Sequence, residues 1–187
     1  MKKYKKHTDE ALMSLIQKGK EEAFNELYKR YSNRLLHFMY RMLGQNEAKA
    51  QDFLQDLFLK IVKHPEKFDI EKNFKTWVFT VAANQCKNSY RQQHKTAVDI
   101  DQIAELSISD SSHTIDNAAF KAELKERLNE LHPVYKEVFI LRHHEGLTLD
   151  EIAIVADCPL GTVKSRLHSA TRALSKKLIH YQDECYD

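Results

Sequence analysis

Cationic side chains gather near one end of this chain without any carboxylate among them. Residues 160–180 hold Lys164, Arg166, Arg172, Lys176 and Lys177, and no Asp or Glu. Arginine suits bidentate contacts to guanine, lysine holds phosphate, and hydroxyl side chains contact either. A helix carrying this stripe would suit DNA, although on charge alone a solvated helix face explains it equally well.

The residues before this stripe favour the DNA interpretation. Thr148 and Glu151 form a capping box that begins a short helix. Ala153 is small where two helices must cross, Asp157 tolerates the positive φ of a tight turn, and Pro159 sets the backbone entering a second helix. This pattern predicts a helix-turn-helix, and the acid-free second helix disfavours an ordinary helical hairpin with surface lysines. The second helix would present Thr162, Lys164, Ser165, Arg166 and His168 to bases and phosphates, while Arg172 and Lys176 follow the DNA backbone.

The elements that must position this motif are expected to be helices throughout. Four Gly and three Pro in 187 residues leave few obligatory turns, and 42% hydrophobic residues suffice for packed cores. Apolar residues recur at helical spacing in four segments before residue 93. The first segment begins after Thr8, and the second runs from about residue 24 to Gly44. The third runs from about residue 47 to 63, and the fourth begins near Asn73.

The chain divides into two helical domains and a linker. Residues 94–117 lose the helical period and are acidic and Ser-rich, and their length is unusual for a loop inside one domain. Residues 1–93 carry 18 Lys and Arg against 11 Asp and Glu, whereas residues 119–187 carry 10 against 11. We therefore predict an all-α fold with a four-helix N-terminal domain (1–93), a flexible acidic linker (94–117) and a C-terminal helix-turn-helix domain (118–187).

Several functional classes find no support in the sequence. No apolar run approaches 18 residues and no signal peptide follows Met1, so we expect a soluble, cytoplasmic protein without membrane insertion.

The three cysteines are widely spaced, so disulfides are not expected, and inert packing is favoured for Cys86 and Cys158 over redox sensing. The ten histidines are scattered, which favours structural or surface roles over a metal site. No nucleophile motif, phosphate loop or paired carboxylates suggest an enzyme, and no cofactor is expected.

Six segments, three in each domain, occur in the order found in one family and carry a resemblance to it. Residues 131–142, 145–148 and 158–167 resemble the promoter-distal domain of extracytoplasmic-function (ECF) sigma factors of bacterial RNA polymerase, in the sigma-70 superfamily. Residues 23–31, 55–61 and 74–82 resemble the core-binding and promoter-melting domain of the same family. The resemblance implies a subunit that binds core RNA polymerase and directs initiation at promoters with minus-ten and minus-thirty-five elements.

The resemblance also implies roles for residues of the first domain. The third helix would dock on the clamp helices of the largest polymerase subunit, although plain solvation also explains its two aspartates. The fourth helix would end in the element that reads the minus-ten sequence, while Trp77 is expected to serve the core rather than stack on a base. The polymerase-binding residues are Asp52, Phe53, Gln55 and Asp56; the minus-ten residues are Asn84, Gln85, Lys87, Asn88 and Arg91.

Further partners follow from the same resemblance. The linker would run through the active-site cleft of the polymerase, and the second domain would bind the minus-thirty-five element and the flap of the second-largest subunit. A cognate anti-sigma factor is expected to sequester the protein. Ala83 departs from the family pattern, in which a basic residue is common there. The rival interpretation is a helix-turn-helix regulator that binds duplex DNA alone.

Overall fold

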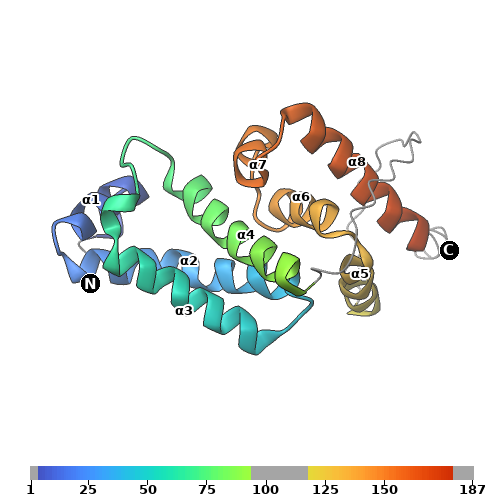
Figure 1. Cartoon of the computed structure of the whole chain (residues 1–187), viewed down its shortest axis with the longest axis horizontal. Helices are drawn as coiled ribbons and strands as arrows, with labels where there is room; N and C mark the ends of the chain where they lie inside the picture. The colour runs from blue at the N-terminus through green and yellow to red at the C-terminus, as the bar shows by residue number, and fades with distance from the viewer. Residues whose placement is uncertain (1–3, 94–117, 179–187) are drawn as a thin grey trace.

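The computed structural model describes residues 4–93 and 118–178 of the chain, and these residues form helices without any strand (Figure 1). The predicted linker, residues 94–117, lies outside the described residues. The N-terminal unit contains α1 (Asp9–Gln17), α2 (Glu21–Met42), α3 (Glu47–Lys63), the short 3-10 helix η1 (Pro65–Lys67) and α4 (Phe74–Gln93). The C-terminal unit contains α5 (Ala118–Glu130), α6 (Pro133–His143), α7 (Leu149–Ala156) and α8 (Leu160–Lys177). The all-α prediction is confirmed for this part of the chain.

Local capping interactions set where several helices begin. Thr8 accepts a hydrogen bond from the backbone N–H of Ala11, and Asn46 accepts one from Lys49 in the same way. Asn73 accepts a hydrogen bond from the N–H of Thr76 at 2.9 Å, which begins α4. Each cap satisfies a backbone donor that the helix itself leaves unpaired.

Aromatic rings fill the core of the N-terminal unit. Phe38 and Phe79 meet edge to face with ring centroids 5.5 Å apart, an arrangement that aromatic pairs favour. Trp77 is partly buried and packs against Phe68 and Phe74, with centroids 5.2 and 5.7 Å away. The expected core role of Trp77 is therefore confirmed.

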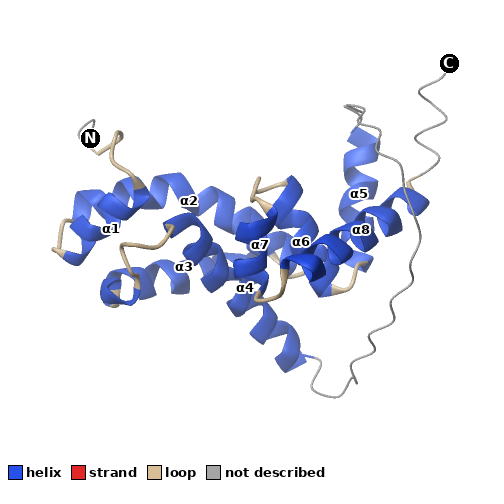
Figure 2. Ribbon diagram, turned by 90° about the horizontal axis from the view of Figure 1, so that it is seen from above, coloured by secondary structure: helices blue, strands red, loops and turns tan. Residues whose placement is uncertain are grey.

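The two units pack against each other. Helix α4 lies along α7, and α2 contacts α6 (Figures 1 and 2). Buried apolar side chains of the N-terminal unit and of α6, α7 and α8 form one continuous cluster. A second, small cluster of Leu128, Leu174 and Leu178 joins α5 to α8. The described conformation is thus a closed one, in which the units share a core.

Candidate functional site

The turn between α7 and α8 has the geometry of a helix-turn-helix. Thr148 and Glu151 form both hydrogen bonds of the predicted capping box. Asp157 ends α7 in the left-handed conformation, with φ of 52°, and its N–H reaches back to the carbonyls of Ala153 and Ile154. Pro159 then precedes α8 with φ of −58°. Both ends of the turn are therefore set by local chemistry, which orients α8 relative to α7.

Helix α8 buries one face and exposes most of its predicted DNA contacts on the other. Val163, Ala170 and Leu174 are buried. Lys164, Ser165, His168 and Lys176 are exposed, whereas Thr162 and Arg166 are half-buried. The exposed face combines cations with hydroxyl and imidazole groups, a set able to contact phosphates and base edges.

Arg172 departs from its predicted position along the DNA backbone. Only 9% of its surface is exposed. A guanidinium must reach solvent to contact phosphate, so Arg172 is not available to DNA in the closed conformation. The helical period places Arg172 in line with the exposed His168 and Lys176, so its burial does not follow from the apolar face of α8.

The predicted minus-ten residues lie on the last turns of α4 but differ in accessibility. Asn84, Asn88 and Arg91 are exposed, whereas Gln85 and Lys87 are half-buried. The side-chain oxygen of Gln85 is buried without a hydrogen-bond partner among the described residues. The structure brings all five together on one helix but leaves only three at the surface.

Lys87 is held by the C-terminal unit. Its Nζ lies 3.0 Å from Oε1 of Glu137, and it also lies 3.5 Å from the carbonyl of Ala156. The first contact is an ion pair. The Glu137 side chain is 2% exposed, and burial raises its pKa against the opposing effects of Lys87 and Arg166. A lysine predicted to hold DNA phosphate is instead neutralised by a carboxylate.

Two further ion pairs cross between the units. Nε of Arg34 in α2 lies 3.2 Å from Oε2 of Glu145, and the same guanidinium donates a 3.0 Å hydrogen bond to the Glu145 carbonyl. Lys75, at the start of α4, lies 3.6 Å from Glu151. In each pair the N-terminal unit supplies the cation and the C-terminal unit supplies the carboxylate.

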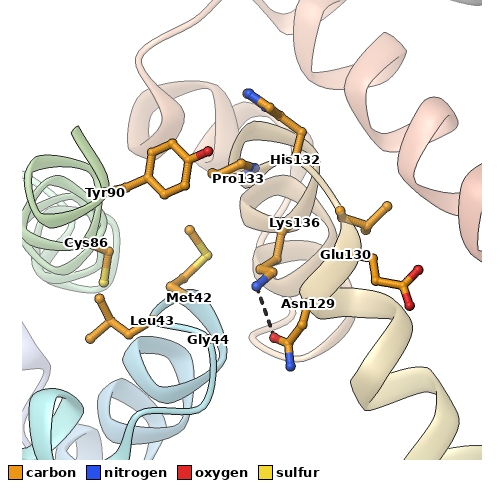
Figure 3. Close-up of a pocket in the computed structure, with 11 residues that line it drawn as sticks. Met42, Leu43, Gly44, Cys86, Tyr90, Asn129, Glu130, His132, Pro133 and Lys136 are labelled. Atoms are coloured by element: carbon orange, nitrogen blue, oxygen red, sulfur yellow. Dashed lines mark hydrogen bonds between the residues drawn. The ribbon is translucent and has the colours of Figure 1, made fainter. Parts of the chain in front are cut away.

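A cavity of about 530 Å³ lies between the units (Figure 3). Met42, Leu43 and Tyr90 line it from one side, and Pro133 and Lys136 line it from the other. The ammonium of Lys136 donates hydrogen bonds to Asn129 Oδ1 at 3.1 Å and to the Arg41 carbonyl at 3.2 Å. Burial lowers the pKa of Lys136. The units therefore do not fill the space between them completely.

The predicted polymerase-binding residues share the outer side of α3. Asp52, Gln55 and Asp56 are exposed, and Phe53 is half-buried with the Lys49 ammonium 5.8 Å from its ring centroid. These four residues form one surface, which accords with their expected grouping.

An apolar groove that the sequence did not predict lies next to this surface. The groove has a volume of about 580 Å³ and lies between α2 and α3. Tyr28, Leu59 and Val62 along it are 44%, 44% and 50% exposed, and Tyr28 packs on Phe58 at 4.7 Å between ring centroids. Large apolar side chains left exposed side by side indicate a protein-binding surface. Helical spacing placed Tyr28 in the core stripe, and no signal in the sequence separated its exposure from that of its buried neighbours.

The part of the chain that the structure describes holds no candidate metal site, and one of its cysteines, Cys86, is buried. No group of three His, Cys, Asp or Glu side chains there is placed to hold a metal ion. Cys86 is 3% exposed and burial raises the pKa of its thiol to about 12, which accords with an inert packing role. Among the same residues, no helix has the length and apolar character needed to cross a membrane.

Comparison with known proteins then decides the family. Residues 27–96 match the family described as Sigma-70 region 2, and residues 121–174 match the family described as Sigma-70, region 4. The ECF RNA polymerase sigma-E factor of Haemophilus influenzae is 31% identical over 182 residues, which cover 91% of this chain and 95% of that relative. This chain belongs to the ECF sigma factors.

Solved structures agree with this sigma factor's fold. The sigma factor RpoE of Bartonella quintana, solved in complex with the anti-sigma factor NepR, has a TM-score of 0.63 and 26% identity, covering 83% of this chain and 96% of that one. The structure of CnrH, solved with the cytosolic domain of CnrY, shares the fold with a TM-score of 0.69 and 24% identity, covering 92% and 97%. The chain is a transcription initiation factor that acts with RNA polymerase to direct it to promoters.

Proposed function

We propose that this sigma factor reads promoters with two separate surfaces, one in each unit. Residues 1–93 form the polymerase-binding and minus-ten domain, residues 118–187 form the minus-thirty-five domain, and residues 94–117 link them. The observation that carries the proposal is the exposed, acid-free face of α8, which follows a turn of helix-turn-helix geometry. Lys164, Ser165 and His168 on this face contact bases and phosphates, with Thr162 and Arg166 beside them.

The last turns of α4 recognise the minus-ten element. Asn84 and Asn88 offer amide donors and acceptors to the edge of a base removed from the stack, and Gln85 adds a third amide. Arg91 holds phosphate, and Lys87 joins it once released from Glu137. A surface that binds single-stranded DNA needs cations to contact phosphates and amides to contact base edges. The exposed amides and cations of α4 supply both kinds of group.

The α2–α3 surface binds core polymerase. The apolar groove supplies buried area, and Asp52, Gln55 and Asp56 supply an acidic and amide rim. This combination suits a partner with a basic, amphipathic pair of helices, such as the clamp helices of the largest subunit. Phe53 would lie at the edge of that contact. The second domain would contact the flap of the second-largest subunit.

A cognate anti-sigma factor is a further proposed partner. The sigma factor of Bartonella quintana was solved with such a partner, and the exposed groove of this chain offers an apolar surface for one. We also propose that the chain acts in the cytoplasm by binding alone, without a cofactor and without a catalytic step of its own.

Reconstitution with purified bacterial core RNA polymerase tests the proposal. The expected result is co-elution of the two on a sizing column and new, discrete transcription start sites on genomic fragments. Lys164→Ala with Arg166→Ala should lower initiation without affecting co-elution, while Lys18→Ala, an exposed cation far from α8, should change neither.

The rival regulator function predicts a different outcome. A regulator would bind duplex DNA specifically without polymerase and would not co-elute with core enzyme. That result would overturn the proposal. Co-elution with no start site on any fragment would leave polymerase binding in place but contradict promoter reading.

A further inference from the structure

We propose that the cavity lined by the ends of α2 and α4 and the start of α6 binds a small organic carboxylate with an apolar body, and that Lys136 is its counter-ion. The cavity has a volume of about 530 Å³, which is that of an ordinary small-molecule site. None of its lining residues is among those proposed to contact promoter DNA or core polymerase, so the site is separate from both surfaces.

Lys136 is a buried cation whose partners are neutral. Only 5% of its surface is exposed. Its ammonium donates to Asn129 Oδ1 at 3.1 Å and to the Arg41 carbonyl at 3.2 Å. An ammonium has three N–H donors, so the described residues leave one of them without an acceptor. Burial lowers the pKa of Lys136, and no carboxylate in the described part of the chain opposes this effect. Since a buried charge is costly unless it is paired, a ligand carboxylate would supply the charge that the site lacks.

Two positive features face the same space. The hydrogen bond to the Arg41 carbonyl joins α6 to the last turn of α2, and Figure 3 shows the Lys136 amine on the side of α6 that faces Met42 and Leu43. Helix α6 begins at Pro133, and the residue before it, His132, provides no side-chain cap. The positive end of the α6 dipole therefore adds to the attraction for an anion.

The other walls suit an apolar ligand body. Met42, Leu43 and Cys86 line one side, and Pro133 lines the other. Tyr90 lies at the rim and is 37% exposed, so a ligand can enter from solvent. A phosphate would bury several oxygens against these side chains without donors, whereas a carboxylate has fewer acceptors to satisfy. The chemistry of the walls therefore favours an apolar carboxylate over a phosphate ester.

Glu130 also lines the cavity, but its charge is directed to other cations. It is exposed and forms ion pairs with Arg127 in its own helix and with Lys177 in α8. Among the described lining residues it is the single carboxylate, and it does not pair with Lys136. The buried ammonium thus remains available to a ligand.

Isothermal titration calorimetry on the full chain tests the site with two matched probes, β-naphthoate and the neutral β-naphthamide. The probes share one ring system and differ in charge. We expect β-naphthoate to bind the wild type about tenfold more tightly, because its carboxylate gains a charged hydrogen bond. The amide should compete with the carboxylate, since both occupy one cavity.

Three variants locate the binding. Lys136→Met removes the charge, and it should lower the affinity for β-naphthoate to that for β-naphthamide, which should not change. Lys125→Met removes an exposed lysine one turn before Asn129 and should keep the tenfold preference. Met42→Trp enlarges a half-buried side chain that lines the opposite wall, and it should weaken binding of both probes about tenfold or more.

Several outcomes would overturn the site. Equal affinity of the wild type for both probes, or no binding of β-naphthoate, excludes an anion site of this kind. A preference for β-naphthoate that persists in Lys136→Met, or disappears in Lys125→Met, places the anion elsewhere. If circular dichroism shows that Lys136→Met does not fold, Met42→Trp decides, and unchanged binding of both probes there contradicts the proposal. Initiation with core polymerase is measured separately and does not depend on any of these results.

Discussion

Arg34 in α2 and Glu145 after α6 form an ion pair at 3.2 Å although 111 residues separate them in sequence. Arg34 also lies over the rings of Tyr31 and Phe79, at 5.6 and 5.5 Å from their centroids. The guanidinium therefore joins the aromatic core of the N-terminal unit to a buried carboxylate of the C-terminal unit. This relationship links the stability of one unit to the placement of the other.

Removing Arg30 should destabilise the N-terminal unit. Its guanidinium binds Asp9 at 2.7 Å and Glu26 at 3.0 Å, and donates to the backbone carbonyls of His7 and Lys5. We expect Arg30→Ala to lower the free energy of unfolding by about 2 kcal/mol, because charged hydrogen bonds are lost together. Urea denaturation measures this change. Lys29→Ala, its exposed neighbour, should stay close to the wild type.

Charge in the α2–α3 groove should weaken polymerase binding without unfolding the protein. Leu59→Glu combined with Val62→Glu alters two side chains that are already largely exposed. We expect affinity for core polymerase to fall by about tenfold or more, since central apolar contacts dominate protein interfaces. Binding to immobilised core enzyme measures the loss. Ile70→Glu, an exposed apolar residue outside the groove, is the control, and an equal loss there would contradict a role for the groove.

Single lysine removal on α8 should change the salt dependence of promoter binding. Lys164→Ala should reduce the slope of log affinity against log salt by about 1, because one phosphate contact releases its counterion. The slope is measured by titrating holoenzyme with promoter DNA at several salt concentrations. An unchanged slope for Lys164→Ala would mean that Lys164 faces solvent in the complex. The control, Lys18→Ala, is expected to leave the slope unchanged.

The turn of the helix-turn-helix should be sensitive to side-chain branching at one residue. Asp157 is exposed and holds φ of 52°, a conformation that glycine adopts freely and β-branched residues resist. We expect Asp157→Val to lower the free energy of unfolding by about 1–2 kcal/mol and Asp157→Gly to leave it equal or slightly higher. Chemical denaturation of both variants checks this, and equal stability of Val and Gly would contradict a backbone cause.

Loss of the proton from Glu137 should lower the free energy of unfolding as pH rises. Burial raises the pKa of Glu137, so the folded chain binds this proton more readily than the unfolded chain. The free energy of unfolding must then fall as pH rises from the ordinary carboxyl pKa through the raised one. Glu137→Gln should remove this contribution and reduce the difference in stability between pH 5 and pH 8. Glu126→Gln, at an exposed site, should leave the difference unchanged.

Local features of this sigma factor were readable from the sequence, because near neighbours in the chain determine them. The helical period predicted α3 from about residue 47 to 63, and the structure has it at Glu47–Lys63. The capping box of Thr148 and Glu151 and the positive φ of Asp157 follow from side chains within a few residues. The ordered motifs of both units likewise indicate the family through residue types and spacing alone.

Long-range features were decided only by tertiary structure. Lys87 and Arg172 have the same cationic character in the sequence as Lys164, yet one is paired with Glu137 and the other is buried. The exposure of Tyr28 and its groove was equally invisible in a regular apolar stripe. Periodicity states which residues share a face of a helix. Which face another helix covers depends on packing between segments distant in sequence, and that packing determines which cations remain available to DNA.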